Sequence, residues 1–130
     1  MANAKILIVD DDPDFVEATR VVLAEKGYDV SAAYSGAEGL ERARSEQPDL
    51  IILDIIMPHE NGFRVCEQIK ADVDLAAIPV IILTNIAHRW GETGISRREG
   101  LGLAAESYFD KPVQPEELVG RIEKLLQKVA

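Results

Sequence analysis

Short apolar runs that alternate with helix-like segments are the feature that most restricts the fold of this chain. Between the runs, apolar residues recur every three or four positions, as on the buried face of a helix. Strands that are apolar throughout and alternate with helices form parallel sheets covered on both faces. The pattern therefore predicts an α/β fold with five strand–helix units. The predicted strands are Ile6–Val9, Tyr28–Ala33, Leu50–Leu53, Val80–Leu83 and Ser107–Asp110.

The predicted first helix has signals at both ends. Asp12 is a good N-cap and Pro13 suits the first helical position, while Gly27 is a plausible stop. Helical spacing predicts a buried stripe along this helix. The stripe consists of Phe15, Ala18, Val22 and Leu23.

Similar signals predict the other helices. Ser35-Gly-Ala-Glu38 fits a capping box that opens a second helix, and Pro48 marks its end. A third helix begins at Asn61-Gly62 and a final one at Pro115. In Asn85–Ala105 four glycines weaken a continuous helix, so we expect a broken helix or a long loop.

Composition limits the class of protein. With 130 residues and 47% hydrophobic content, we expect a single domain over residues 1–130. The formal net charge of -9 disfavours direct binding to nucleic acid or to anionic membranes. The lone Cys66 has no partner for a disulfide or a zinc site and is most simply a core residue. No signal peptide or long apolar run is recognised, so we expect a soluble, cytoplasmic protein.

Polar residues follow four of the predicted strands. Asp10-Asp11 follows the first strand, Asp54 the third, Thr84 the fourth and Lys111 the fifth. In a parallel sheet these positions all reach the carboxyl edge, which is where open α/β sheets bind their ligands. We therefore expect the candidate site at this edge.

The acidic residues suggest a cation site. Capping by Asp12 accounts for one acid of the Asp10-Asp11-Asp12 run and leaves two, which repel each other unless a cation lies between them. Mg²⁺ prefers such oxygen ligands, particularly if Asp54 adds a third carboxylate. The alternative is a set of solvated loop acids.

Asp54 is the candidate nucleophile because it directly follows four large aliphatic residues. Its carboxylate could accept a phosphoryl group and form an acyl phosphate. Such a transfer needs positioning and neutralisation of charge, for which Thr84 offers a hydroxyl and Lys111 an ammonium group. Taken singly, Thr84 could equally cap the next segment, and Lys111 could be a solvated lysine before a turn.

In this order the motifs resemble the receiver domains of two-component response regulators. The resemblance covers essentially the whole chain. It rests on Ile6-Leu-Ile-Val-Asp10-Asp11, Leu53-Asp54-Ile-Ile-Met57-Pro58, Gly62, Thr84 and Asp110-Lys111-Pro112. It implies a flavodoxin-like (βα)5 sheet with strand order 2-1-3-4-5, as in a chemotaxis regulator.

The resemblance also implies roles for individual residues. Asp54 would accept the phosphoryl group from a phosphohistidine on a sensor histidine kinase or a histidine phosphotransfer protein. Asp11 would bind Mg²⁺ directly and Asp10 mainly through water, and Asp54 and the backbone carbonyl of Ile56 would complete the protein ligands. Thr84 and Lys111 would each contact a phosphoryl oxygen.

A phosphoryl group would also change the surface of such a domain. It adds about two negative charges at pH 7 and new acceptor oxygens. Thr84 would be drawn inward, and Tyr108, which matches the switch aromatic of the family, would move to a buried rotamer. Tyr108 could instead be packed in the core throughout. The downstream partner protein, the oligomeric state and the lifetime of the phosphorylated state are not predicted.

The chain departs from typical receivers between Thr84 and Lys111. Extra residues fall in His88–Gly102, which contains Trp90 and the basic pair Arg97-Arg98; a partner surface and a loop both fit this segment. Asn85 replaces the usual small residue and could alter the lifetime of the phosphorylated state. His59 and His88 lack partners at ligand spacing and are expected to be solvated.

Two other functions compete with a signalling module whose catalysis is limited to its own phosphorylation and dephosphorylation. One is a haloacid-dehalogenase-like phosphatase with an aspartyl-phosphate intermediate, but those enzymes carry the nucleophile after the first strand. The other is a receiver-like scaffold that binds partners without phosphorylation, although the full set of expected acids argues against it.

Overall fold

The computed structural model of the chain describes residues 4–57, 60–84, 106–110 and 113–129. Within these residues, five strands form one parallel sheet in the order β2-β1-β3-β6-β7. This order confirms the flavodoxin-like prediction. The strands are β1 (Lys5–Val9), β2 (Asp29–Ala33), β3 (Leu50–Asp54), β6 (Val80–Thr84) and β7 (Ser107–Asp110).

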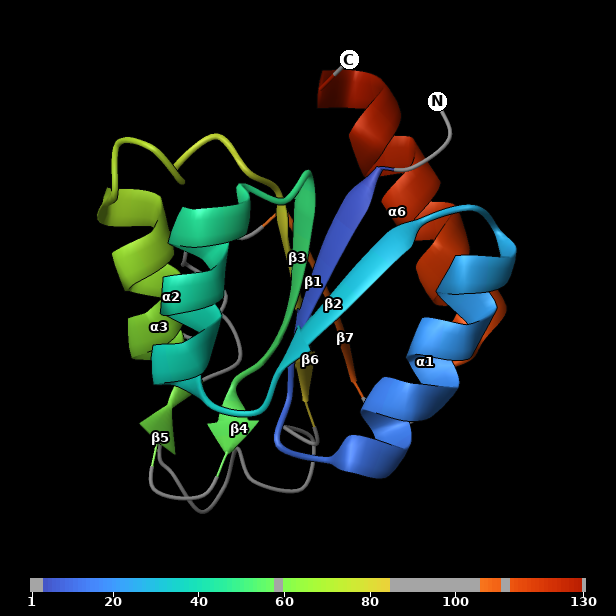
Figure 1. The fold of residues 1–130 in the computed structure, drawn as a ribbon, viewed down its shortest axis with the longest axis horizontal. Helices are drawn as coiled ribbons and strands as arrows, with labels where there is room; N and C mark the ends of the chain where they lie inside the picture. The colour runs from blue at the N-terminus through green and yellow to red at the C-terminus, as the bar shows by residue number, and fades with distance from the viewer. Residues whose placement is uncertain (1–3, 58–59, 85–105, 111–112, 130) are drawn as a thin grey trace.

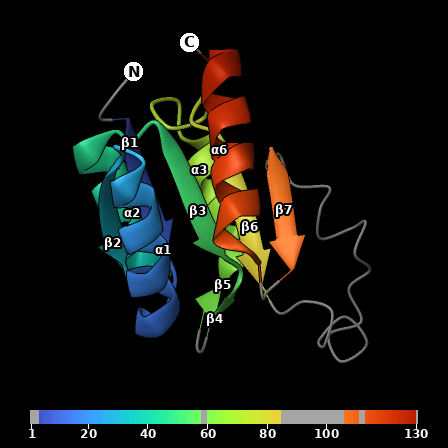
Figure 2. The ribbon, with the colours of Figure 1, turned by 90° about the vertical axis from the view of Figure 1, so that its right-hand side faces the viewer.

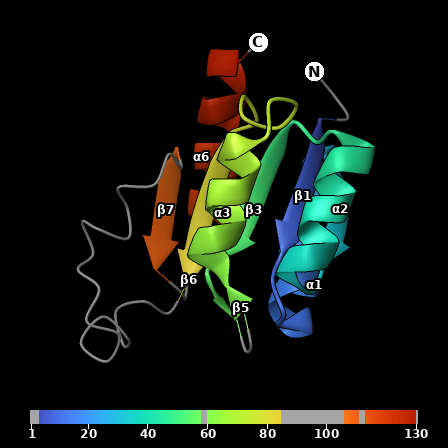
Figure 3. The same ribbon diagram turned by 90° about the vertical axis from the view of Figure 1, so that its left-hand side faces the viewer.

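Helices cover both faces of this sheet. Helices α2 (Gly36–Glu46) and α3 (Gly62–Ala71) lie on one face, and α1 (Pro13–Glu25) and α6 (Pro115–Val129) lie on the other (Figure 1). Figure 2 views the molecule from the side of α1 and α6, and Figure 3 shows α2 and α3 side by side on the opposite face. None of the helices among the described residues is both long and apolar enough to cross a membrane.

The sheet divides the apolar interior into two clusters. Successive side chains of a strand point to opposite faces, so Leu7 and Val9 pack toward α2 and α3, while Ile6 and Ile8 pack toward α1 and α6. All five residues of β3 are buried. This double burial explains why the central strands are apolar throughout rather than alternating with polar residues.

The buried stripe of α1 differs from the predicted one. Val16, Thr19 and Leu23 are buried, whereas Ala18 is exposed and Phe15 and Val22 are only partly buried. The prediction for Ala18 was therefore wrong. The helix is rotated so that Val16, Thr19 and Leu23, which lie on one face at helical spacing, point toward the sheet, and Ala18 falls outside that face.

The predicted helix starts have the expected caps. The Asp12 carboxylate accepts hydrogen bonds from the backbone N–H groups of Asp14 and Phe15, and Pro13 takes the first helical position. Ser35 Oγ accepts a hydrogen bond from the backbone N–H of Glu38. The Glu38 carboxylate accepts one from Tyr34, a residue before the cap, rather than closing the predicted box on Ser35.

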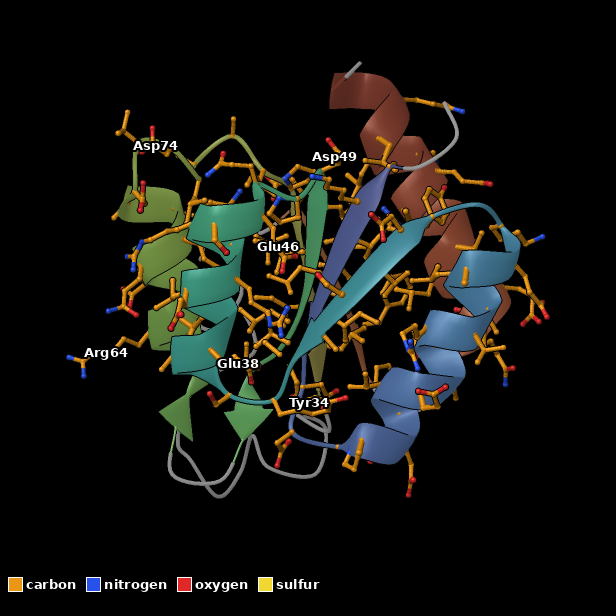
Figure 4. All side chains as sticks on the ribbon, viewed as in Figure 1. Tyr34, Glu38, Glu46, Asp49, Arg64 and Asp74 are labelled. Atoms are coloured by element: carbon orange, nitrogen blue, oxygen red, sulfur yellow. The ribbon has the colours of Figure 1, made fainter. Side chains whose placement is uncertain are left out.

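A small antiparallel hairpin, β4 (Ile56–Met57) and β5 (Glu60–Asn61), lies at the carboxyl edge of the sheet and was not predicted. In Figure 4, Tyr34 marks this same edge at the end of β2, and Asp49 marks the opposite, amino edge before β3. The predicted broken helix or loop over Asn85–Ala105 lies outside the described residues, as does the His88–Gly102 segment within it.

Candidate functional site

Three carboxylates meet at the carboxyl edge of the sheet. Asp10 and Asp11 follow β1, and Asp54 is the last residue of the neighbouring strand β3. The register pairs Val9 with Leu53, so the two strands end level with each other. One carboxylate oxygen from each of the three residues lies within 4.8 Å of the others. The structure thus brings together the acids that the sequence placed on separate strands.

The three acids differ in their exposure to solvent. Asp10 and Asp54 are only 1% and 5% exposed, whereas Asp11 is exposed. The backbone N–H of Asp10 donates to the carbonyl of Ala33 at 3.0 Å, and its carboxylate accepts the N–H of Asp12 at 3.0 Å. Asp10 is therefore held in place from β2 and from the start of α1, and the site opens to solvent on the side of Asp11.

The chemistry of these ligands suits a hard divalent cation. All three offer carboxylate oxygens, which Mg²⁺ and Ca²⁺ prefer to nitrogen or sulfur ligands. Carboxylates this close repel one another, and a cation between them removes that repulsion. Because Asp12 is occupied with capping α1, it does not compete for this role.

The loop after Asp54 is held by a close backbone contact. The N–H of Ile55 donates to Leu83 on β6 at 3.3 Å, and the carbonyl of Ile55 accepts the N–H of Gly62 at 3.1 Å. A Cβ at Gly62 would collide with the Ile55 backbone, so only glycine fits at the first residue of α3. Sequence reasoning included Gly62 in the motif but did not recognise this packing role.

The other predicted site residues are described only in part. Thr84 ends β6 and pairs with Asp110, so its backbone lies at the same edge as Asp54; Tyr108 pairs with Ile82 within β7. Ile56 lies in the β4–β5 hairpin beside Asn61. The side chains of these residues lie outside what the structure describes.

Several further predictions fall on residues that the structure does not describe. These residues are Lys111, His59, Asn85, His88, Trp90, Arg97 and Arg98. Cys66 is described and is fully buried among apolar residues of α3 and the sheet, as predicted. Burial raises the pKa of its thiol to about 11, so the reactive thiolate is scarce at neutral pH.

Known proteins resemble this chain over nearly all of its length. The family described as the response regulator receiver domain matches residues 6–123. Protein PilH of Pseudomonas aeruginosa is 38% identical over 127 residues, which cover 95% of this chain and 98% of PilH. The DNA-binding dual master transcriptional regulator RpaA of Synechocystis is 36% identical over 95% of this chain but 49% of its own length. The chain thus spans about half the length of some curated relatives.

A solved structure shows the same fold. The CheY-like receiver domain protein of Methanospirillum hungatei aligns with a TM-score of 0.84 and 28% identity, covering 98% of this chain and 97% of that one. These matches do not favour the haloacid-dehalogenase-like alternative. From the family match, the sheet order and these relatives, the chain belongs to the response regulator receiver domains of two-component signalling systems.

Proposed function

We propose that this receiver domain accepts a phosphoryl group on Asp54 from a phosphohistidine of a sensor histidine kinase or a histidine phosphotransfer protein, with the help of Mg²⁺. The observation that supports this best is the gathering of Asp10, Asp11 and Asp54 within 4.8 Å at the carboxyl edge. A buried carboxylate that lies beside two further carboxylates suits a cation-assisted transfer.

In the proposed step, an oxygen of Asp54 attacks phosphorus while the bond from phosphorus to the histidine nitrogen breaks. The imidazole leaves with the electrons of that bond, and the product is an acyl phosphate on Asp54. The bound cation would neutralise negative charge on the phosphoryl oxygens. Asp10, Asp11, Asp54 and the backbone carbonyl of Ile56 are the proposed protein ligands.

In this proposal the three acids have different tasks, which we argue from their burial and hydrogen bonds. Asp54 is buried at the end of a fully buried strand, so its carboxylate has little freedom to turn away from the donor. Asp10 is fixed by two hydrogen bonds with neighbouring backbone, one donated by its N–H to Ala33 and one accepted by its carboxylate from Asp12. Asp11 is exposed, and an incoming cation and donor would approach on its side.

The family resemblance supplies the rest of the proposal. Thr84 and Lys111 would contact phosphoryl oxygens, and Tyr108 would report the change to the surface through its rotamer. The surface changed in this way would bind a downstream protein whose identity we leave open. We do not extend the DNA binding of RpaA to this chain, because the net charge of -9 on this chain opposes contact with phosphates.

The proposal includes three broader points. We assign residues 1–130 to a single domain, because β1, β2, β3, β6 and β7, which span the described residues, share one sheet. We assign it no catalysis beyond its own phosphorylation and dephosphorylation, and we place its action in the cytoplasm.

The test is phosphorylation by a small acyl phosphate in Mg²⁺, followed by intact mass spectrometry. We expect the mass of one phosphoryl group to be added to the native chain and none to an Asp54→Asn variant. Asp29→Asn, which changes an exposed aspartate on β2, is the matched control and should behave as the native chain.

Equal addition to the native chain and the Asp54→Asn variant would reject Asp54 as the acceptor, and no addition to either would favour the scaffold alternative. Steady hydrolysis of phosphate esters that depends on Asp10 rather than Asp54 would instead favour the phosphatase. Omitting Mg²⁺ or adding a chelator should abolish labelling of the native chain.

A further inference from the structure

A polar cluster at the amino edge of the sheet, away from the acids, joins α3 to β6 and β7. Lys70 Nζ lies 3.0 and 3.1 Å from the two carboxylate oxygens of Glu106. It also donates to the backbone carbonyls of Ile78 at 2.8 Å and Ala76 at 3.3 Å. The Lys70 side chain is only 11% exposed, so its charge is held by these acceptors rather than by water.

Glu106 in turn holds Val80 with two hydrogen bonds. The Glu106 N–H donates to the Val80 carbonyl at 3.0 Å, and the Glu106 carboxylate accepts the Val80 N–H at 2.7 Å. Val80 is the first residue of β6, and Glu106 directly precedes β7. We call Lys70, Glu106 and Val80 the register clamp. A shift of β7 by one residue would break the contacts of Glu106 with Lys70 and with Val80 at the same time.

Two features of the chain leave the register of β7 weakly specified without this clamp. The connection from Thr84 to Glu106 comprises residues 85–105, and the closure entropy of so long a segment changes little with small differences in length. Tyr108 and Phe109 are adjacent aromatics, so a slip by one residue still presents an aromatic to each face. The long segment before β7 and the pair of aromatics therefore select the observed pairing of Ile81 with Ser107 only weakly.

We propose that the register clamp selects the pairing of β7 with β6 and thereby positions the residues at the carboxyl end of β7. Lys70 and Glu106 are positioning residues in this scheme and do not touch the candidate site. A slip would move Tyr108 and Lys111 by about 3.3 Å along the strand direction relative to Thr84. The consequence for phosphoryl transfer rests on the proposed function, whereas the register itself does not.

The first experiment measures register in the unphosphorylated protein by NMR. Cross-strand proton contacts between β6 and β7 identify the pairing, and amide hydrogen exchange measures how well it holds. In Lys70→Met and Glu106→Ala we expect exchange of the β7 amides to accelerate about tenfold or more, as for the loss of a charged hydrogen bond. A second set of shifted cross-strand contacts should accompany the faster exchange, while β1 and β3 keep native protection.

Conservative and matched variants separate positioning from a general loss of stability. Lys70→Arg keeps the charge and Glu106→Gln keeps an acceptor for Val80, so both should retain the native contacts more fully than Lys70→Met and Glu106→Ala. Arg44→Met removes the ion pair between α2 and Asp72, which does not involve β7, and should leave the β7 contacts unchanged. Native contacts in both Lys70→Met and Glu106→Ala, or equal acceleration of exchange in β1, β3 and β7, would overturn the proposal. If Glu106→Ala does not fold, the comparison of Lys70→Met with Lys70→Arg decides alone.

A second experiment measures phosphorylation of the same variants by the small acyl phosphate. Slower labelling of Lys70→Met, in proportion to its shifted population, supports the link from register to the site. If the β6–β7 contacts shift but the rate of labelling stays native, the role of the clamp in setting the register is supported. The proposed role of Lys111 in phosphoryl transfer is then contradicted. Absence of labelling in the native chain would count against the proposed function and would leave the NMR result on register unaffected.

Discussion

The two edges of the sheet hold their charged residues in opposite ways. At the carboxyl edge, carboxylates of the same sign gather within 4.8 Å, and two of them are buried. At the amino edge, the partly buried Lys70 is matched by Glu106 and by backbone carbonyls. Like charges this close repel one another, and a bound cation would relieve that repulsion, whereas the opposite charges of the clamp attract one another. The first arrangement suits a ligand, and the second suits the fold.

The largest loss of stability is expected from a substitution at Gly62, which contacts the backbone of Ile55 at the carboxyl edge. Gly62→Ala would force Ile55 away from α3, so the free energy of unfolding should fall by about 2–3 kcal/mol. Urea unfolding followed by circular dichroism measures the change. Gly120→Ala is the matched control, because a Cβ there meets open space within α6, and it should raise stability by about 0.5–1 kcal/mol. Equal stability of the native chain and Gly62→Ala would contradict the contact.

The next effect concerns the clamp at the amino edge. Lys70→Met leaves the Glu106 carboxylate without its cation, and since Glu106 is 36% exposed we expect a moderate loss of about 2 kcal/mol in urea unfolding. Arg44→Met breaks a pair in which Arg44 is 57% exposed and should cost less than about 1 kcal/mol. If the two variants lose the same stability, the clamp has no special role in the fold.

Removing a charge from the carboxyl edge should increase the free energy of unfolding, whereas the substitutions at Gly62 and Lys70 decrease it. Asp10→Asn keeps an oxygen that can accept the Asp12 N–H but relieves repulsion among the acids, so without Mg²⁺ stability should rise by about 1 kcal/mol. The same variant should gain less stability from added Mg²⁺ than the native chain does. Thermal unfolding with and without Mg²⁺ measures both changes, with Asp29→Asn as control. A less stable Asp10→Asn without Mg²⁺ would contradict the role of repulsion.

The smallest effect is a pH dependence at the amino edge. The backbone N–H of Asp74 and the guanidinium of Arg44 lower the pKa of Asp72. A lowered folded-state pKa gives stability that is present above the unfolded pKa of about 3.9 and is lost as pH falls through the folded value. Urea unfolding of the native chain and Asp72→Asn should therefore differ at about pH 6 and converge only in acid below the folded-state pKa of Asp72. A constant difference across this range would contradict the assignment.

Much of the fold followed from local sequence patterns. The five strands have the predicted positions, with ends that differ by a residue or so. The central strands β1, β3 and β6 were the clearest, because strands buried on both faces are continuous apolar runs. The meeting of Asp10, Asp11 and Asp54 followed from their places after parallel strands. Their roles, and those of Thr84, Lys111 and Tyr108, stay predictions.

Other features had no local signal. Ala18 fits a helical stripe as well as Val16 does, and only packing against the sheet decides which of them is buried. Lys70 and Glu106 lie far apart in the sequence and read singly as solvated charges. The collision that excludes a side chain at Gly62 depends on the path of the loop after Asp54, which residue types alone do not reveal.

Because the sheet divides the interior, consecutive residues of one strand can pack against entirely different sets of side chains. Leu7 and Ile8 are consecutive, yet their side chains belong to different apolar clusters. Substitutions at sites without shared partners have nearly additive effects. Substitutions in one cluster should therefore be nearly additive with distant substitutions in the other, although the two clusters are separated by only the thickness of a polypeptide backbone.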